Sequence, residues 1–493
     1  MLPLLFHLLA LQASCPNGCG GTNVVVTVDD AGASAAEYAS DTLPTLPRSV
    51  PVATYSHGEH LDFNGTIVIA GTLSLNPSDP YYSYSKVFRQ SLELFARWLH
   101  EERGGVRLGD ARYGIRFHWV GDGSSQEQVT NATAHALRTS GAHFAISGYS
   151  SGLTLYAAKQ SYAEGILMVS GGAASTAVFT QNNLTYGFYP PAGSYTTNSM
   201  LAIEYAARAV DTRAQAGATR DSDSRCGGGD VSCLASLRVA FVQADTVFTR
   251  AQCLSAPQNA LDAGLTLLGT SDAADAAMAT VAREPDEDEL DEALRTFEAA
   301  GANVLIGCTY YSTAKAIIAS LERLDWAPLA IAVTEAVGSN PVYAAEVLDG
   351  WWQGEYVLGP TPWHPTTPAR GAFSNLTSDD FYARYKEAYD SAEVTYHGAA
   401  NFAAAGTLVH AIERAQSLET AAVAAQMDAT QVVLPLPTIA IMHCACPSPS
   451  TAMAGMRLNC PLHAVARHAC CSWTSSTARY RSTPTTRSSC RWW

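Results

Sequence analysis

The feature of this 493-residue chain that most constrains its fold is a regular alternation of two kinds of apolar segment. Short β-branched runs such as IVIAGTLSL and YGIRFHWVG predict buried strands, and segments such as SKVFRQSLELFARWLHEERGG predict amphipathic helices. One strand and one helix together take about 25 to 30 residues, a spacing typical of βαβ units. Crossovers of this kind join parallel strands and are right-handed. The sequence therefore predicts an α/β fold with mainly parallel central sheets.

Two such series follow one another along the chain. The first covers residues 65–192, and an aromatic connector with the sequence YGFYPPAGS leads into a second series over residues 193–335. A polar insertion at 211–235 interrupts the second series. Paired α/β units commonly hold a ligand in the cleft between them. We therefore expect two Rossmann-like lobes joined by a hinge.

A short motif after the third predicted strand allows a catalytic interpretation. Gly148-Tyr149-Ser150-Ser151-Gly152 matches the G-x-S-x-G turn, in which a serine between a strand and a helix acts as a nucleophile. A serine hydrolase would also need an acid and a histidine later in the chain, and the available histidines are His364, His397 and His410. No HGGG-type oxyanion segment precedes the motif, which argues against catalysis. A serine hydrolase is therefore the alternative function.

The same motif also suits the binding of an anion without any catalysis. A serine-rich turn at a helix N-terminus offers hydroxyls and free backbone N–H groups, which favour a carboxylate. A second such turn, residues 170–175 with the sequence SGGAAS, follows the next strand. Adjacent parallel strands bring both turns to one edge of the sheet, where ligand sites form in α/β proteins. This pair of turns predicts a small polar ligand that carries a carboxylate.

The order of these segments resembles the type I periplasmic-binding fold. IVIAGTLSL, ARWLHEERGGV, YGIRFHWVGDGSSQEQ, HFAISGYSSGLTL and GILMVSGGAAS are similar to the leucine/isoleucine/valine-binding proteins and to the ligand-binding region of metabotropic glutamate and natriuretic-peptide receptors. GWWQGEYVLGPTPWHP and YKEAYDSAEVTYHGAANFAAAGTLVHAIERA also fit. The resemblance covers residues 65–433. It implies a first lobe made of residues 65–192 and 336–425 and a second lobe made of residues 193–335.

The resemblance also implies which residues bind the ligand. In that family a serine matching Ser151 and the turn matching Ala173 and Ala174 hold the α-carboxylate and ammonium of an amino acid. Ala174 stands where a threonine is usual, so Ser175 would have to supply the hydroxyl. Tyr82, or its neighbour Tyr81, matches the aromatic residue that covers the ligand. The remaining predicted contacts are Ser150 in the first lobe and Phe248, Tyr310 and Glu335 in the second.

Composition excludes several other classes of function. The chain is 47% hydrophobic, 15% charged and carries a formal net charge of −15, which is incompatible with general disorder. An acidic chain without a Lys/Arg-rich run is a poor nucleic-acid binder, so we expect no nucleic-acid partner. No cysteine and histidine pattern has zinc spacing, and we expect neither a metal nor a cofactor.

Several features favour the secretory route. Residues 1–13, MLPLLFHLLALQA, resemble the core of a signal peptide, and an irregular leader segment follows over residues 14–64. Four Asn-x-Ser/Thr acceptors are candidate glycosylation sites: Asn64, Asn131, Asn183 and Asn375. Cys226 and Cys233 would close a small surface loop, and Cys253 and Cys308 either pair or remain buried thiols. We therefore expect a secreted or cell-surface protein.

The last segment, residues 434–493, breaks the α/β pattern. It contains half of the twelve cysteines and six arginines, and it has no Lys, Asp or Glu. One interpretation is a disulfide-rich or metal-binding module, although its Cys spacings fit no zinc template. The interpretation we favour is a reading-frame error after residue 433, which sequencing of the transcript across this region tests.

These observations together predict a non-enzymatic, extracellular binding domain. It captures a small polar ligand, an amino acid or related carboxylate, as a solute-binding protein or as the ectodomain of a receptor. The resemblance further implies a homodimer through the first lobe, or a membrane receptor or signalling domain that this chain does not contain.

Overall fold

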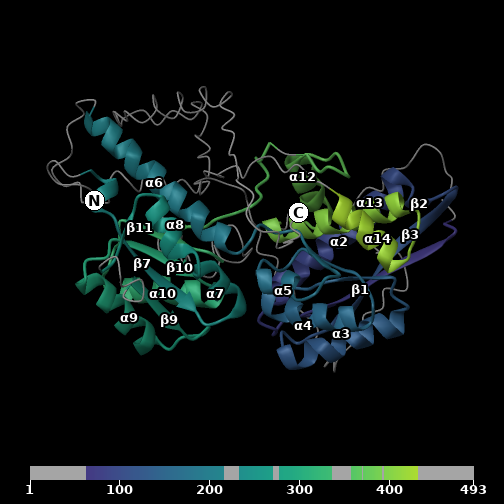
Figure 1. The fold of residues 1–493 in the computed structure, drawn as a ribbon, viewed down its shortest axis with the longest axis horizontal. Coiled ribbons are helices and arrows are strands. Elements are labelled where there is room, and N and C mark those ends of the chain that lie inside the picture. The colour runs from purple at the N-terminus through teal and green to yellow at the C-terminus, as the bar shows by residue number, and fades with distance from the viewer. Residues whose placement is uncertain are drawn as a thin grey trace. The chain divides into compact units, whose positions relative to one another are not determined.

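The computed structural model describes residues 63–215, 232–269, 277–335, 357–368, 370–390 and 393–430 (Figure 1). The predicted signal peptide, the leader up to residue 62, Cys226 and the tail from residue 434 lie outside these ranges. No helix in the described ranges is long and apolar enough to cross a membrane.

The first lobe is built on a six-stranded sheet with the order β2-β3-β1-β4-β5-β6. Its central strand β1 (Gly65–Leu73) is buried over its last seven residues, as expected for a parallel strand covered on both faces. β1 pairs in parallel with β3 (Ala111–Gly121) and β4 (Phe144–Ile146), and β4 pairs with β5 (Met168–Ser170).

Two layers of helices cover this sheet (Figure 1). α3 (Gln126–Ser140) and α4 (Ser151–Ala163) lie together on one face, and α2 (Tyr82–Arg103) lies with α13 (Tyr396–Ala415) on the other. α2 and α13 are far apart in the sequence, so the chain returns to the first lobe near its end. α14 (Thr420–Ala429) packs on α13.

The boundaries of these helices follow local chemistry. Ser125 caps α3 by accepting a hydrogen bond from the backbone N–H of Glu127, and Gly141 ends the helix in the left-handed region at φ 65°. Gly104 ends α2 in the same way at φ 69°. Glycine adopts this backbone conformation without the steric cost of a Cβ.

The second lobe is built on another parallel sheet. Its strand order is β12-β11-β10-β7-β8, and β9 also pairs with β7. The strands are β7 (Arg238–Ala244), β8 (Thr266–Leu267), β9 (Met278–Val281), β10 (Val304–Cys308), β11 (Ala330–Val333) and β12 (Val357–Leu358).

Helices cover both faces of this sheet as well. α6 (Gly193–Gln215) packs on α7 (Val247–Cys253) and α8 (Ala256–Asp262), and α9 (Glu287–Ala299) packs on α10 (Tyr311–Arg323). Phe241, Leu294 and Ile306 are among the fully buried side chains of this core.

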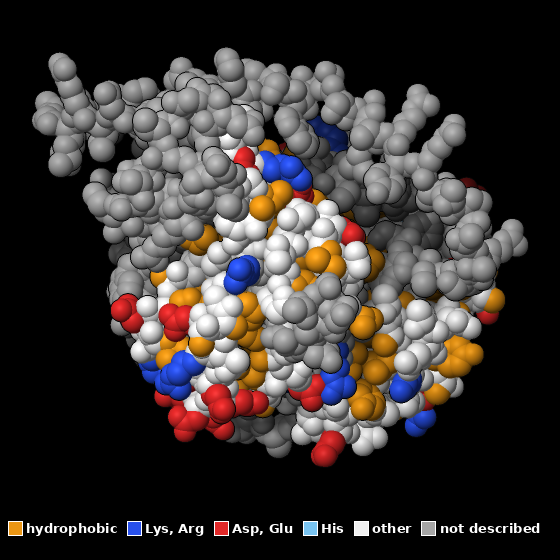
Figure 2. All heavy atoms as spheres, turned by 60° about the vertical axis from the view of Figure 1, so that its left-hand side comes forward, with side chains coloured by type: hydrophobic (Ala, Val, Ile, Leu, Met, Phe, Trp, Pro, Cys, Tyr) orange, Lys and Arg blue, Asp and Glu red, His pale blue; other side chains and the backbone are white. Residues whose placement is uncertain are grey.

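The acidic run of the sequence begins α9. Asp286 caps the helix by accepting from the backbone N–H of Glu289, and Glu287, Asp288 and Glu289 form its exposed first turn. Carboxylates at this end are stabilised by the helix dipole, as expected. Figure 2, in which the left-hand side of Figure 1 comes forward, shows acidic side chains gathered near the lower edge of the face.

The structure differs from the sequence prediction at four short strands. β2 (Val106–Leu108) pairs antiparallel with β3, and β6 (Thr185–Gly187) adds an edge strand where we expected only a connector. β9 was not predicted. β12 pairs with β11, so the chain leaves the second lobe after Leu358 and not at residue 335. β2, β6 and β9 are three or four residues long, too short to show a period.

Three further elements complete the described chain. These are α5 (Thr176–Thr180) and α12 (Ser378–Ala388), which contact the first lobe, and a 3₁₀ turn at Leu234–Ser236.

Candidate functional site

Polar and aromatic side chains follow the carboxyl ends of the strands in both sheets. In the first lobe, Ser150 and Ser151 follow β4, and Ala174 and Ser175 follow β5. In the second lobe, Tyr310 follows β10 and Glu335 follows β11. This edge of a parallel sheet is where α/β proteins bind ligands.

Ser151 connects the two turns of the first lobe. Its hydroxyl oxygen accepts hydrogen bonds from the backbone N–H groups of Ala174 and Ser175, each at 3.1 Å. The side chain is 2% exposed. The amides that the sequence assigned to ligand carboxylate binding are thus already bonded to Ser151.

Asn401 of α13 holds the second turn from the other side. Its amide nitrogen donates to the carbonyl of Gly171 at 3.1 Å. Gly171 allows this approach because a Cβ there would lie 2.7 Å from the backbone of Asn401. The turn therefore depends on a helix that lies more than 200 residues further along the chain.

Ser150 lies among tyrosines. It caps α4, with its oxygen accepting from the backbone N–H of Leu153 at 3.5 Å, and it hydrogen-bonds with the side chains of Tyr81 and Tyr310. Burial raises the pKa of both tyrosines, and that of Tyr310 lies well above its ordinary value. Both hydroxyls therefore stay protonated and available as hydrogen-bond donors.

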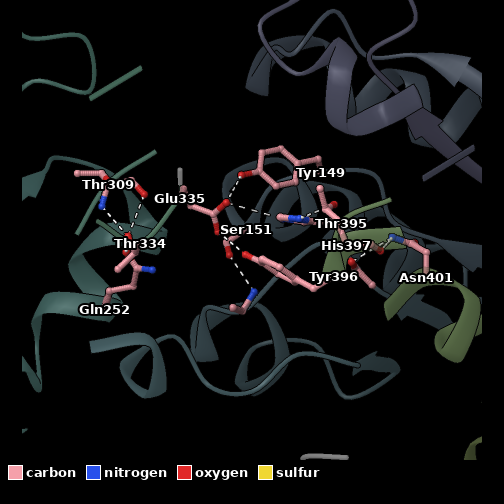
Figure 3. Close-up of polar contacts among 12 residues, drawn as sticks. Tyr149, Ser151, Gln252, Thr309, Thr334, Glu335, Thr395, Tyr396, His397 and Asn401 are labelled. Carbon is pink, nitrogen blue, oxygen red and sulfur yellow. Dashed lines mark hydrogen bonds and ion pairs between the residues drawn. The ribbon is translucent and has the colours of Figure 1, made fainter. Parts of the chain in front are cut away.

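In the second lobe, two buried threonines hold Tyr310 and Glu335 in register. The hydroxyl oxygen of Thr334 accepts from the backbone N–H of Thr309 at 2.9 Å (Figure 3). The Thr334 hydroxyl also lies 2.9 Å from Oε1 of Gln252 on α7. Because each threonine directly precedes a site residue, this contact fixes the spacing of the two loops.

A disulfide lies beside this contact. Cys253 at the end of α7 and Cys308 at the end of β10 are joined, and both are fully buried. Cys233 is also buried and disulfide-bonded, whereas Cys226 lies outside the described residues.

Glu335 reaches from the second lobe to residues of the first lobe (Figure 3). Its carboxylate accepts hydrogen bonds from the hydroxyl of Tyr396 at 2.8 Å and from that of Tyr149 at 3.4 Å. Nε2 of His397 lies 3.9 Å from Oε2. Glu335 is 2% exposed, so these donors stabilise a charge that burial would otherwise penalise.

A cavity of only about 10 Å³, room for about one water molecule, adjoins this network. Both lobes line it, mostly with aromatic side chains. The lining residues are Tyr149, Ser150, Ser151, Gly172, Ala174, Tyr189, Tyr195, Phe248, Tyr310, Glu335 and His397. Ligand pockets commonly measure about 300–1,000 Å³, so in this arrangement the cavity is too small for a ligand and the lobes must open to admit one.

Aromatic rings pack closely around the cavity. The rings of Tyr84 and Tyr149 are stacked with centroids 4.0 Å apart, and Tyr81 meets Tyr149 edge-on at 5.0 Å. Tyr310 and Phe248 lie 5.4 Å apart in the second lobe. Such a surface favours apolar or aromatic parts of a ligand.

The structure brings together six of the nine residues predicted as ligand contacts. The six that line the cavity are Ser150, Ser151, Ala174, Phe248, Tyr310 and Glu335. Tyr82 does not line it. Tyr82 is the first residue of α2 and half-buried, whereas Tyr81 is 6% exposed and packs against Tyr149, so Tyr81 is the better candidate for the covering aromatic.

Ala173 and Ser175 are buried but do not line the cavity either. Ser175 begins α5 and its backbone N–H is bonded to Ser151. The prediction that the Ser175 hydroxyl replaces the usual threonine is therefore not supported.

Sequence reasoning missed the aromatic and histidine part of the site. Tyr149, Tyr189, Tyr195 and His397 line the cavity, and Tyr396 bonds Glu335. The clustered aromatic residues in the segments YGFYPPAGS and VTYHG would have indicated Tyr189, Tyr396 and His397 from the sequence. Their convergence depends on the return of the chain to the first lobe.

The serine hydrolase alternative gains no support from this geometry. The described hydrogen bonds of Ser150 and Ser151 go to backbone amides and tyrosines, and neither serine bonds a histidine. His397 faces Glu335, and His410 packs against Phe373 away from the cavity. Within the described residues no group of three His, Cys, Asp or Glu side chains could hold a metal ion.

The fold and the cleft define a class of binding proteins. A family model described as periplasmic binding protein matches residues 73–459. The chain belongs to the periplasmic binding protein family, as the sequence analysis predicted. The match continues past residue 433, where the predicted two-lobed domain ends, into residues that the structure does not describe.

Solved structures share the predicted two-lobed α/β fold, which is thereby confirmed. The leucine-binding protein LivK of Thermotoga maritima is 16% identical, with a TM-score of 0.54 over 73% of this chain and 87% of that one. A type 1 periplasmic binding protein of Bordetella pertussis is 15% identical, with a TM-score of 0.55 over 76% and 91%.

A third structure has a different ligand. It is a solute-binding protein of an ABC transporter from Rhodopseudomonas palustris in complex with 3,4-dihydroxybenzoic acid, 10% identical, with a TM-score of 0.52 over 74% of this chain and 85% of that one. A comparison with the sequences of curated proteins gives no match.

Proposed function

We propose that this chain is a solute-binding protein that closes its two lobes around a small molecule bearing a carboxylate, with an amino acid as the favoured ligand class. The observation that carries this proposal is the meeting of Glu335 with the first-lobe residues Tyr149 and Tyr396 beside an aromatic cavity. A buried carboxylate in such a place favours a ligand with a cationic or hydrogen-bond-donating group.

Each polar group of the cleft has a role in this proposal. The hydroxyls of Ser150 and Ser151 face the ligand carboxylate, and Glu335 accepts from the ligand ammonium. Phe248, Tyr310 and Tyr149 pack against its apolar part. Binding therefore needs both lobes and favours the closed arrangement.

The similar structures support a small ligand with a carboxylate. One is a leucine-binding protein and another was solved with 3,4-dihydroxybenzoic acid. These two ligands differ beside the carboxylate, because only leucine carries an ammonium group on the adjacent carbon. The presence of Glu335 in the cavity is our reason for preferring the amino acid.

Calorimetric titration tests this function. We expect heat on addition of at least one of L-leucine, L-phenylalanine or benzoate, and a loss of affinity of about tenfold or more in Glu335→Ala for the amino acids. Tyr162→Ala is the matched control, because this residue of α4 is 51% exposed and distant from the cavity lining. No heat with any of these three compounds would refute the proposal.

We also propose the secretory route for this chain. All four glycosylation acceptors in the described chain are exposed, as that route requires. Mass spectrometry of the protein expressed in a secretory host, before and after enzymatic removal of N-glycans, tests occupancy of Asn64, Asn131, Asn183 and Asn375. Homodimerisation through the first lobe and a separate signalling partner remain proposals of the family resemblance.

A further inference from the structure

The two ends of the cleft differ in charge. Glu335 provides a carboxylate at one end. At the other end, where Ser150 bonds Tyr81 and Tyr310, the guanidinium of Arg283 lies over both tyrosine rings, at 4.7 Å and 5.2 Å from their centroids. Arg283 belongs to the second lobe and Tyr81 to the first.

Arg283 lies at the ligand-binding edge of the second sheet, next to the cavity-lining residue Tyr310 but not in the cavity lining itself. It follows β9 by two residues, at the same carboxyl edge as Tyr310 and Glu335. Its Nε atom is buried and has no hydrogen-bond partner, and no ion pair of Arg283 occurs in the described part of the chain. By contrast, Arg250 and Arg323 of the same lobe are paired with carboxylates.

An unpaired guanidinium is informative in this chain. Acidic residues outnumber basic ones by 45 to 30, so partners for an arginine are abundant. A buried donor without a partner costs stability, and guanidinium groups bind carboxylates bidentately. Among the described residues the buried Nε of Arg283 has no acceptor, so an acidic group of a ligand would satisfy it.

The first lobe has few donors left for such a group. The amides of Ala174 and Ser175 are bonded to Ser151. Ser151 can still donate its own O–H, and Ser150 is shared with two tyrosines. Hydroxyls alone leave a buried carboxylate without a countercharge, which is unfavourable.

We propose that Arg283 is the specificity-determining residue that binds the ligand carboxylate, supplied by the second lobe. The ligand is then dipolar, with its acidic group toward Arg283, Tyr81 and Tyr310 and its donor group toward Glu335. This inference rests on the proposed function. It also means that the carboxylate is bound in full only when the lobes are closed, since Arg283 and Ser150 come from different lobes.

Acid and amide pairs of the same ligand test this role. We would titrate the protein with L-leucine and L-leucinamide, L-phenylalanine and its amide, and benzoate and benzamide. In the wild type the acid of at least one pair binds about ten- to a hundredfold more tightly than its amide. In Arg283→Gln this ratio falls close to one, and in Arg283→Lys, which keeps the charge but loses the planar fork, it takes an intermediate value.

Arg238→Gln is the matched control. Arg238 is an exposed residue at the amino end of β7 in the same lobe. Arg238→Gln therefore changes the net charge as Arg283→Gln does, but at a position outside the cleft. A preference for the acid that survives in Arg283→Gln would overturn the inference and leave the binding function standing. Equal binding of acid and amide by the wild type would also overturn the inference and leave the binding function standing. If none of the six compounds binds, the proposed function and the inference both fall.

Discussion

Ser151 stabilises the fold of the site through its oxygen, and in the proposed function its hydroxyl hydrogen donates to the ligand. Because its oxygen accepts from two buried amides, Ser151→Ala leaves two N–H groups without partners. We expect a loss of about 2 kcal/mol or more in the free energy of unfolding, together with weaker ligand binding. Urea denaturation measures the first effect.

Ser140→Ala is the control for this prediction. The hydroxyl of Ser140 bonds only the carbonyl of Ala136 within α3, and its removal should change stability by less than about 0.5 kcal/mol. Equal urea midpoints for Ser151→Ala and Ser140→Ala would show that the amides find other partners.

His100 makes the stability of the first lobe depend on pH. Burial lowers its pKa from 6.5 to about 4, and its Nε2 accepts from the backbone N–H of Ile115 at 2.8 Å. The unfolded chain therefore binds a proton more readily than the folded one. The contribution of His100 is fully present above pH 6.5 and is lost as the pH falls toward 4, up to about 3 kcal/mol.

His100→Gln should remove this part of the pH dependence, because glutamine is not titrated. For each protein we compare the urea midpoint at pH 7 with that at pH 4.5. His135→Gln is the control, because His135 is an exposed residue of α3. A difference that is as large in His100→Gln as in the wild type would contradict the assignment.

At the scale of elements, the disulfide between Cys253 and Cys308 ties α7 to the end of β10, directly before Thr309 and Tyr310. It closes a loop between residues 55 positions apart. We expect Cys253→Ala/Cys308→Ala to lose roughly 3–4 kcal/mol of stability. Because Tyr310 and Phe248 flank this bond, ligand affinity should fall as well.

Thermal unfolding with and without a reducing agent measures this contribution. The wild type should unfold at a lower temperature when reduced, while the double variant should be insensitive to the reducing agent. Mass spectrometry of the intact protein after alkylation reports whether the two thiols are joined. A wild type that unfolds identically in both conditions would contradict the prediction.

At the scale of the whole molecule, the contact between Glu335 and Tyr396 favours lobe closure before any ligand binds. Tyr396→Phe removes a 2.8 Å hydrogen bond to a buried carboxylate, a loss of about 1.5–3 kcal/mol. This shifts the population toward open arrangements. We expect a larger radius of gyration by small-angle X-ray scattering in the absence of ligand.

Tyr385→Phe is the matched control, since the Tyr385 hydroxyl bonds Gln90 within the first lobe. Its radius of gyration should equal that of the wild type. If Tyr396→Phe also scatters like the wild type, Glu335 does not hold the lobes together.

The sequence by itself determined the elements, their order and the turns at the edge of each sheet. Helix and strand periods are local properties, and buried runs such as IVIAGTL are unambiguous because they are apolar on both faces. Ser150 and Ser151 could be predicted because they form a turn between a strand and a helix, whereas Tyr310 and Glu335 were predicted from the family resemblance. The short strands β2, β6 and β9 could not be predicted, because three or four residues carry no period.

Only the tertiary structure decided which of these residues meet. Tyr396 and His397 come from α13, and Arg283 comes from a loop without a motif, so their nearness to the cavity depends on contacts across the sequence. The tertiary structure also decided what the predicted donors do. The amides after β5 bond Ser151 because the packing of Asn401 on Gly171 fixes that turn. Side-chain partners of this kind depend on long-range packing, which sequence periodicity does not encode.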